Sequence, residues 1–232
     1  MQASVIIPTY NEAENLPQLL AHIDQIQDQK LLEILLIDGG STDQTLALAQ
    51  GYSLVKTYSC PQKGRAIQMN LGAHLARGDL LYFVHADTLP PLSFLEDIAQ
   101  ALQEGFPMGC YRFQFNSSRK ILRINAYFTR FDRLMCRGGD QSLFITAQLF
   151  RELGGFKSEY VIMEEYDLLQ RARRRAPFKI MPKNILVSAR KYEHNSYLKV
   201  NLANLLVFMM YFLGFSPGTL QKIYRRLLFS NS

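Results

Sequence analysis

The sequence predicts an α/β protein with a mainly parallel sheet flanked by helices and a helical extension at the C-terminal end. Three observations predict this fold class. Short apolar runs alternate with helical segments through the first half of the chain. These runs are apolar throughout, which is typical of strands covered by helices on both faces of a parallel sheet. Residues 198–229 lack this alternation and have the pattern of two helices.

The first half of the chain repeats a strand followed by a helix. The expected strands are the apolar runs 3–8, 31–37, 54–58 and 80–84. The expected helices are 16–23, which has Leu and Ile at helical spacing, then 45–50 and 65–76. Ser41 or Thr42 can cap the second of these helices.

The second half is less regular. Its expected elements are a helix from Pro90 to about Glu104, a strand over 108–115, a helix around 164–175, and two helices over 198–229 that are broken at 214–218. With 232 residues and no internal repeat, the chain fits one domain, residues 1–195, and an appended helical extension, residues 196–232.

Two aspartates follow expected strands directly. Asp38 ends the run 31–37, and Asp87 comes shortly after the run 80–84. Because open α/β sheets bind ligands outside the carboxyl ends of their strands, we expect both aspartates to face one pocket.

Charge and cysteine usage restrict the partners. The formal net charge of +6 favours an anionic partner, such as a nucleotide diphosphate, a nucleic acid or an acidic lipid surface. Cys60, Cys110 and Cys136 are odd in number and lack metal-ligand spacing, so neither a disulfide framework nor a structural zinc site is expected. No secretory signal is visible, and we expect a cytoplasmic protein, with contact at the inner face of the membrane left open.

Several sequence strings, in this order along the chain, resemble family 2 inverting glycosyltransferases, which have the GT-A fold. They are Val5-Ile-Ile-Pro-Thr-Tyr-Asn-Glu12, Ile37-Asp-Gly-Gly-Ser-Thr-Asp-Gln-Thr45, Gly64-Arg-Ala-Ile-Gln-Met-Asn-Leu-Gly-Ala73, His85-Ala-Asp87, Gly138-Gly-Asp-Gln141 and Met163-Glu-Glu-Tyr-Asp-Leu168. The strings are most similar to those of the small transferases described as radical-SAM/selenodomain-associated.

The resemblance implies a nucleotide-diphospho-sugar donor. It places Pro8, Tyr10 and Glu12 beside the base and ribose, with Glu12 accepting from a sugar hydroxyl and Asp38 accepting from the base. The further candidate donor-binding residues are Lys63, Arg65, His85, Ala86, Asp140, Arg171 and Arg174. For Asp140, the alternatives are binding of acceptor hydroxyls or a plain turn. Capping of the local loops is the alternative for Glu12 and Asp38, and a solvated basic loop is the alternative for Lys63 and Arg65.

The resemblance also implies a divalent metal, Mn²⁺ or Mg²⁺. His85-Ala-Asp87 stands where the family has two acidic residues, so Asp87 is the expected metal ligand and His85 is a departure. A hard cation needs few protein ligands when diphosphate oxygens and water complete its shell. His194 is an additional candidate ligand.

An acidic pair at a helix start supplies the catalytic base in this family. By this alignment the base is Glu165, where an Asp is expected, and Glu164 is its acidic neighbour. An inverting transfer needs one carboxylate to remove a proton from the attacking acceptor hydroxyl. The alternative is that both glutamates only stabilise the helix N-terminus.

The C-terminal helices allow three interpretations. The apolar residues from Leu202 to Leu213, followed by Lys222, Arg225 and Arg226, fit a membrane-surface helix that serves a lipid-linked acceptor, a homodimer interface, or ordinary core packing.

Two other functions remain as alternatives to transfer. One is a non-catalytic nucleotide-sugar-binding module, and the other is a nucleotidyltransferase, for which the expected Gly-rich phosphate loop is missing. Nucleic acid is not an expected partner, because acidic residues, and not basic stripes with aromatics, mark the strand ends.

Overall fold

The computed structural model describes residues 1–193 and 195–229. The strands are β1 (Ala3–Thr9), β2 (Leu31–Asp38), β3 (Val55–Ser59), β4 (Leu80–Phe83), β5 (Thr88–Leu89), β6 (Met108–Asn116), β7 (Leu143–Thr146) and β8 (Phe178–Ser188). The helices are α1 (Leu16–Ile23), α2 (Thr45–Ala49), α3 (Arg65–Leu75), α4 (Phe94–Gln103), α5 (Leu122–Phe128), α6 (Ala147–Glu152), α7 (Glu164–Ala172), α8 (Tyr197–Phe212) and α9 (Pro217–Phe229).

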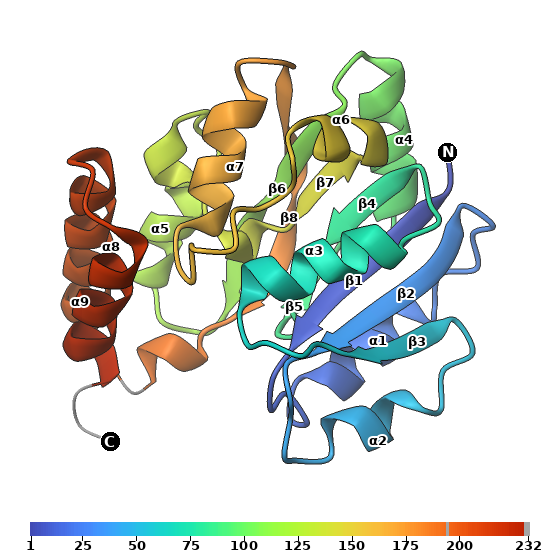
Figure 1. Ribbon diagram of the computed structural model, residues 1–232, viewed down its shortest axis with the longest axis horizontal. Coiled ribbons are helices and arrows are strands. Elements are labelled where there is room, and N and C mark those ends of the chain that lie inside the picture. The colour runs from blue at the N-terminus through green and yellow to red at the C-terminus, as the bar shows by residue number, and fades with distance from the viewer. Residues whose placement is uncertain (194, 230–232) are drawn as a thin grey trace.

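The strands form one mixed sheet in the order β3-β2-β1-β4-β7-β6-β8-β5 (Figure 1). The pairs β3-β2, β2-β1, β1-β4 and β6-β8 are parallel, whereas β7 runs antiparallel to both β4 and β6, and β5 antiparallel to β8. The α/β class with a mainly parallel sheet and flanking helices is therefore confirmed.

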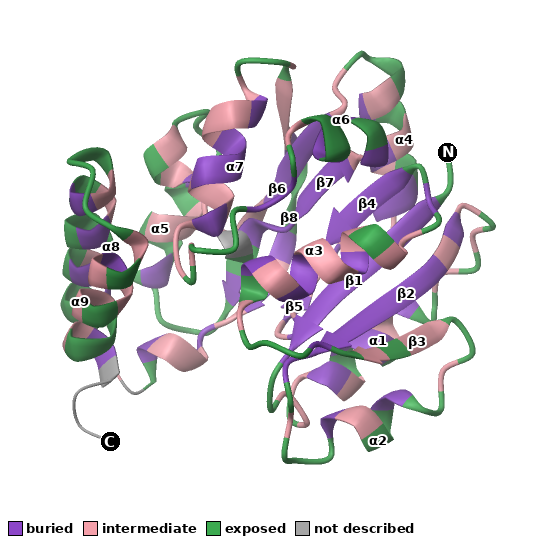
Figure 2. Ribbon diagram, in the orientation of Figure 1, coloured by how far each residue is buried: buried purple, intermediate pink, exposed green. Residues whose placement is uncertain are grey.

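Helices cover both faces of the sheet. On β1, the side chains of Val5 and Ile7 join a core with α1 and α4, whereas Ile6 between them joins a core with α3, α6 and α7. Successive side chains of a strand point to opposite faces, so a strand covered on both faces is apolar at most of its positions. Figure 2 shows the central strands buried along their length.

Helix α3 lies unusually close to the strands below it. A Cβ on Gly72 would stand 2.4 Å from Cγ2 of Ile6 and 3.1 Å from Cγ1 of Ile37, so only glycine allows this approach. The same helix therefore brings its first turns over the carboxyl ends of β1 and β2.

The elements that the sequence analysis did not anticipate are α5, α6, β5, β7 and β8. Strand β8 contains Pro182, which has no backbone N–H, and its pairing with β6 shifts register there, from Tyr111 opposite Met181 to Arg112 opposite Asn184. The interruption at Pro182 breaks the periodicity of β8, which explains why the sequence analysis missed this strand.

The C-terminal helices α8 and α9 pack against each other and against one side of the domain (Figure 1). Val207 and Met210 of α8 form a small core with Leu220 of α9, and Ile162 and Met163, just before α7, pack against it. None of the described helices is both long and apolar enough to cross a membrane.

A buried carboxylate joins three strands near their starting ends. Glu33 of β2 accepts hydrogen bonds from the Ser4 hydroxyl at 2.9 Å, from Lys56 at 2.9 Å, and from both the backbone N–H and the guanidinium of Arg77 at 2.8 and 3.0 Å. Burial raises the pKa of Glu33, but these donors outweigh it and lower the pKa to about 2.

Replacement of Glu33 by Gln should therefore destabilise the fold in a pH-dependent way. A carboxylate with a lowered pKa stabilises the folded state above its unfolded pKa, and this contribution is lost as the pH falls from about 4.5 to about 2. In urea denaturation, we expect E33Q to lose about 3 kcal/mol at pH 7 and less than half of that at pH 3. The exposed control E96Q should match the wild type at both pH values, and an equal deficit of E33Q at both would contradict the account.

Candidate functional site

Three loops meet at one edge of the sheet. Because β1, β2 and β4 are parallel neighbours, the loops after Thr9, Asp38 and Phe83 leave the sheet on the same side. The sequence analysis expected Asp38 and Asp87 to face one pocket. Asp38 ends β2 and Asp87 lies between β4 and β5, so both lie at this edge, but neither lines the pocket described below.

The loops after β1 and β2 are joined to each other. The backbone N–H of Asn11 donates to Ser41 Oγ at 2.8 Å, and Asn11 Oδ1 accepts from the N–H of Thr42 at 2.8 Å. Asn11 has a left-handed backbone with φ of 54°, a conformation that Asn tolerates better than most residues. These contacts give the two loops a fixed mutual position.

Two buried polar side chains support these loops. The Asp38 carboxylate accepts from the N–H groups of Gly40 and Ser41, both at 2.9 Å, and from the Ser41 hydroxyl. Gln68 of α3 donates to the backbone carbonyls of Thr9 and Ile37 at 2.8 and 2.7 Å. Asp38 thus orders its own loop in this structure, as in the capping alternative, and Gln68 joins the ends of β1 and β2.

An aromatic side chain and two charged groups border this edge. Tyr10 is 42% exposed, and Lys63 Nζ lies 3.5 Å from the centre of its ring. Pro8 is buried within β1. The Glu12 carboxylate accepts from Asn15 at 2.8 Å and pairs with Arg190 at 3.3 Å. Tyr10, Lys63 and Glu12 lie where a planar ring with nearby hydroxyl groups could be bound between cationic and anionic side chains.

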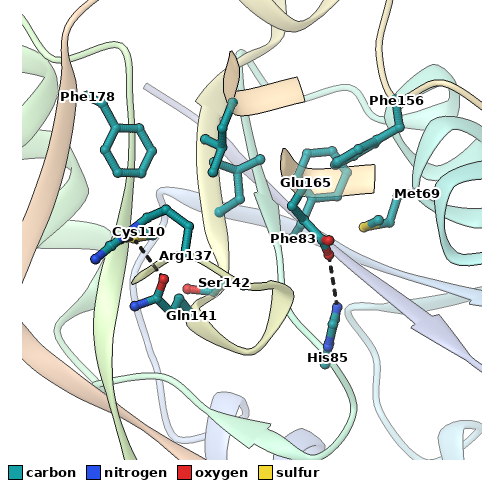
Figure 3. Close-up of a pocket in the computed structure, with 13 residues that line it drawn as sticks. Met69, Phe83, His85, Cys110, Arg137, Gln141, Ser142, Phe156, Glu165 and Phe178 are labelled. Atoms are coloured by element: carbon teal, nitrogen blue, oxygen red, sulfur yellow. Dashed lines mark hydrogen bonds and ion pairs between the residues drawn. The ribbon is translucent and has the colours of Figure 1, made fainter. Parts of the chain in front are cut away.

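A second cluster forms around His85, after β4. Its Nδ1 lies 3.8 Å from Asp140 Oδ1 and its Nε2 lies 3.9 Å from Glu165 Oε1. Figure 3 shows the Glu165 carboxylate directed at His85 across the pocket. The histidine that replaces the expected acidic residue therefore lies between two carboxylates from distant parts of the chain.

The charges in this cluster act on one another. Desolvation opposes ionisation of Asp140, but the contact with His85 and the charges of Lys191 and Arg65 outweigh it and lower its pKa to about 2. Desolvation also opposes the charge on Arg65, but Glu164, Glu165, Asp140 and Asp87 outweigh it, and the pKa of Arg65 is raised. Arg65 thus lies in the combined field of four carboxylates.

Glu164 and Glu165 begin α7. Glu164 is 1% exposed, and burial together with the charge of Glu165 raises its pKa above the usual range. Oε1 of each glutamate is buried and has no hydrogen-bond partner. The residue before them, Met163, has φ of 69°, which is rare for a non-glycine residue and is supported here by packing against α8 and α9.

A pocket lies next to His85 and Glu165. It has an empty volume of about 380 Å³ that includes open solvent. Its lining residues are Met69, Phe83, His85, Cys110, Arg137, Gly138, Gln141, Ser142, Leu143, Phe156, Glu165, Leu169 and Phe178. Three buried polar atoms of these residues, Arg137 Nε, Gln141 Nε2 and Glu165 Oε1, have no partner. Unpaired buried polar atoms are costly, so this pocket has the polar atoms that a hydroxyl-rich ligand or water would satisfy.

The two arginines assigned to the donor lie elsewhere. The Arg171 guanidinium binds Asp167 at 2.6 and 2.8 Å and the carbonyls of Leu153 and Gly155 at 2.6 and 2.8 Å. These contacts fix α7 to the preceding loop. Arg174 is exposed just beyond the C-terminal end of α7, whereas Glu165 lies in its first turn.

Asp87 is the remaining candidate for a metal. Among the described residues, its Oδ1 accepts one long bond, from Thr88 at 3.3 Å, and Ala86 beside it is buried. Within residues 1–193 and 195–229, no group of three or more His, Cys, Asp or Glu side chains is arranged to hold a metal ion. The other expected ligand, His194, lies outside the described residues.

Three site residues were not anticipated: Gln68, Arg137 and Arg190. Gln141 was part of a quoted motif but had no assigned role. Arg190 reaches Glu12 across 178 positions of sequence, and no local pattern announces such a contact. Gln68 lies within the quoted string that begins at Gly64, but its burial, with 4% of the residue exposed, is visible only in the folded chain.

Parts of this chain are similar to known proteins. A dolichol-phosphate mannosyltransferase of Pyrococcus furiosus is 33% identical over 109 residues, which are 45% of this chain and 31% of that protein. The match thus spans about a third of that relative's length.

Two solved structures share the fold. S. aureus TarS 1-349 in complex with UDP-GlcNAc has a TM-score of 0.71 at 19% identity, over 100% of this chain and 74% of that one. Mannosyltransferase PcManGT from Pyrobaculum calidifontis, in complex with GDP-Man and Mn²⁺, has a TM-score of 0.68 at 19% identity, over 97% and 69%. The described fold is thus that of GT-A proteins. The model of the family "Glycosyl transferase family 2" matches residues 4–152, which are more than half of the chain, and the protein therefore belongs to glycosyl transferase family 2.

Proposed function

We propose that the protein transfers a sugar, with inversion, from a nucleotide-diphospho-sugar to an acceptor hydroxyl, and that Glu165 is the general base. One observation carries this proposal: a buried carboxylate oxygen of Glu165, which accepts no hydrogen bond from the described residues, faces a pocket next to the edge where the nucleotide-side loops meet. An inverting transfer requires such an acceptor-side base opposite the departing diphosphate.

The neighbouring glutamate makes this assignment chemically consistent. The raised pKa of Glu164 means that its carboxyl group holds a proton more readily than an ordinary glutamate. A protonated Glu164 adds no negative charge beside the Glu165 carboxylate, whose Oε1 lies 3.9 Å from Nε2 of His85.

The donor would lie along the edge formed by the loops after β1, β2 and β4. Tyr10 offers an exposed ring, Glu12 accepts hydrogen bonds, and Lys63 and Arg65 provide positive charge for the diphosphate. The complexes of TarS with UDP-GlcNAc and of PcManGT with GDP-Man support a donor of this class. We leave Arg171 out of the proposed donor site because Asp167 and two carbonyls occupy it.

A divalent cation fits this edge only when it is shared with the donor. Asp87 offers a partly exposed carboxylate with one weak partner, and a Mg²⁺ or Mn²⁺ held by one or two carboxylates normally takes its other ligands from phosphate and water. When bound, the ion would neutralise charge on the leaving diphosphate. The Mn²⁺ in the PcManGT complex supports the proposal.

Membership of the radical-SAM/selenodomain-associated subgroup also stays a proposal.

His85 would then position the base. Its imidazole lies between Asp140 and Glu165 and holds the Glu165 carboxylate near the pocket, where a second aspartate would repel it. This is a physical reason for a histidine in place of an acidic residue next to a glutamate base.

Replacement of Glu165 by Gln should slow transfer severely and leave donor binding intact. Loss of a general base costs about 10²- to 10⁴-fold in kcat. Turnover and donor affinity should be measured together, on the protein supplied with its identified donor and acceptor. E164Q, which imitates a protonated carboxyl group, should retain activity within about tenfold. The exposed control E159Q should behave as the wild type, and equal turnover of E165Q and E159Q would place the base elsewhere.

Replacement of Asp87 by Asn should remove the metal dependence of nucleotide binding. A charge-assisted contact contributes about 1.5–3 kcal/mol, so affinity in the presence of Mn²⁺ should fall on the order of 10- to 100-fold. Binding in the presence of a chelator should not change. Calorimetric titration of wild type, D87N and the exposed control D24N tests this expectation. Full Mn²⁺-dependent affinity of D87N would rule out Asp87 as the ligand.

A further inference from the structure

The exposed apolar side chains of this protein are concentrated in two segments, 117–137 and 195–229. Within the described residues, twenty large hydrophobic side chains are exposed, and fourteen of them belong to these two segments. In segment 117–137 they are Ile121, Ile124, Tyr127, Phe128, Phe131 and Met135, and in segment 195–229 they are Leu198, Leu202, Leu205, Leu206, Met209, Phe212, Leu213 and Phe215. Such concentration on one part of a surface marks an interaction site.

Helix α8 is apolar on two opposite faces. Val200, Ala203, Val207 and Met210 are buried against the rest of the protein. The opposite face carries Leu198, Leu202, Leu205 and Leu213, with side chains 45–76% exposed. Lys199 is the only charged residue in this helix. A helix that is apolar on opposite faces is normally buried on both, and none of the residues 1–193 and 195–229 covers the outer face of α8.

The exposed face of α5 borders that of α8. Asn125 of α5 donates to Asn201 of α8 at 3.0 Å and accepts from the Tyr197 hydroxyl at 2.8 Å. On a helix, residues three and four positions apart are neighbours. The exposed Ile121 and Phe128 therefore adjoin Asn125, as Leu198 and Leu205 adjoin Asn201. The two exposed apolar faces meet at this asparagine contact, and we call them together the apolar strip.

Aromatic side chains enlarge the strip on the α5 side. Tyr127, Phe128 and Phe131 form a cluster with ring centres 5.6–6.1 Å apart, and the Arg130 guanidinium lies 4.0 Å from the Tyr127 ring centre. Aromatic rings next to arginine are typical of the interface between lipid headgroups and acyl chains.

Positive charge is concentrated in the same two segments. Segments 117–137 and 195–229 contain ten Lys and Arg, of which Arg137 is buried, and one acidic residue, Asp132, which pairs with Arg173. The whole chain has a net charge of +6, so the remainder of the protein is net negative. The exposed basic residues Lys120, Arg123, Arg130 and Arg133 lie in or next to α5, and the exposed Lys222, Arg225 and Arg226 lie on α9, which packs against α8.

We propose that the apolar strip docks on the surface of an anionic lipid bilayer, with the flanking basic residues at the headgroups. Apolar burial and attraction to anionic lipids act together in such docking. A symmetric dimer through the same face would bring the two sets of basic residues against each other, which is unfavourable. The concentration of basic residues around the strip thus favours an anionic bilayer over a second copy of the chain.

This docking would place the pocket beside the bilayer. The ring of Tyr166, which follows Glu165, lies 5.7 Å from that of Phe208 on α8, and the Tyr211 hydroxyl of α8 donates to Gln170 of α7. The proposal concerns the surface alone and does not depend on the reaction proposed for the pocket.

Vesicle flotation without donor or metal tests the proposal. The wild type should float with vesicles of phosphatidylcholine and phosphatidylglycerol at about 0.1 M salt, bind phosphatidylcholine vesicles at least about tenfold more weakly, and dissociate from the anionic vesicles at about 1 M salt. Absence of binding to anionic vesicles at low salt would overturn the proposal.

Matched variants separate the apolar and the charged contributions. The triple substitution L198Q/L202Q/L213Q should weaken vesicle binding about tenfold or more, whereas L54Q/L92Q, at exposed leucines elsewhere, should not. K222E/R225E should weaken binding to anionic vesicles, whereas R151E/R175E should have much less effect.

The thermal unfolding of each variant should be measured first. It should match that of the wild type, because the substituted positions are exposed. Equal binding by the strip variants and their controls would contradict the proposal. The proposal would also be contradicted if the wild type did not bind vesicles but sedimented as a dimer, and L198Q/L202Q/L213Q sedimented as a monomer.

Discussion

The parallel pairing of β1 with β2 and β4 is the constraint on which the candidate site depends. It brings the loops after Thr9, Asp38 and Phe83 to one edge of the sheet, although these residues lie far apart in the sequence. Gln68 then joins the last carbonyls of β1 and β2, and it can do so because Gly72 lets α3 approach the strands closely. The site is therefore a consequence of how the sheet is assembled and covered.

The second half of the chain adds negative charge to this edge, and the structure compensates for it locally. Asp140 and Glu165 both approach His85, and Arg65 lies in the field of these carboxylates and of Glu164 and Asp87. The start of α7 favours acidic groups through its helix dipole. The raised pKa of Glu164 reduces the repulsion further, because a protonated carboxyl group carries no charge. Packing of Met163 against α8 and α9 links this end of α7 to the C-terminal helices.

The sequence was most informative where local periodicity and strand ends coincide. The expected strands of the first half and the helix that begins near Glu164 are found within a few residues of their expected ends. The placement of Asp38 and Asp87 at one edge followed from the same pattern. Strand β7 was missed because it has four residues, and β8 was missed because it is interrupted at Pro182.

Individual contacts were less predictable than elements. Arg171 was expected near the donor, yet it binds Asp167 four positions earlier in α7, a spacing at which opposite charges on a helix commonly pair. The contact between Glu12 and Arg190 depends on the packing of distant segments, which no single-sequence pattern contains. The same holds for His85, whose two carboxylate neighbours become visible only in the folded chain.

Calorimetric titration of the wild type with UDP, GDP, CDP and dTDP, each with and without Mn²⁺, tests the central claim most directly. If the strand-end loops and Asp87 form a donor site, one nucleotide diphosphate should bind more tightly than the others, and Mn²⁺ should strengthen its binding. At equal concentrations, the nucleotide that binds most tightly should also raise the unfolding temperature most. Absence of binding by all four nucleotides, with and without the metal, would contradict a nucleotide-sugar site at this edge of the sheet.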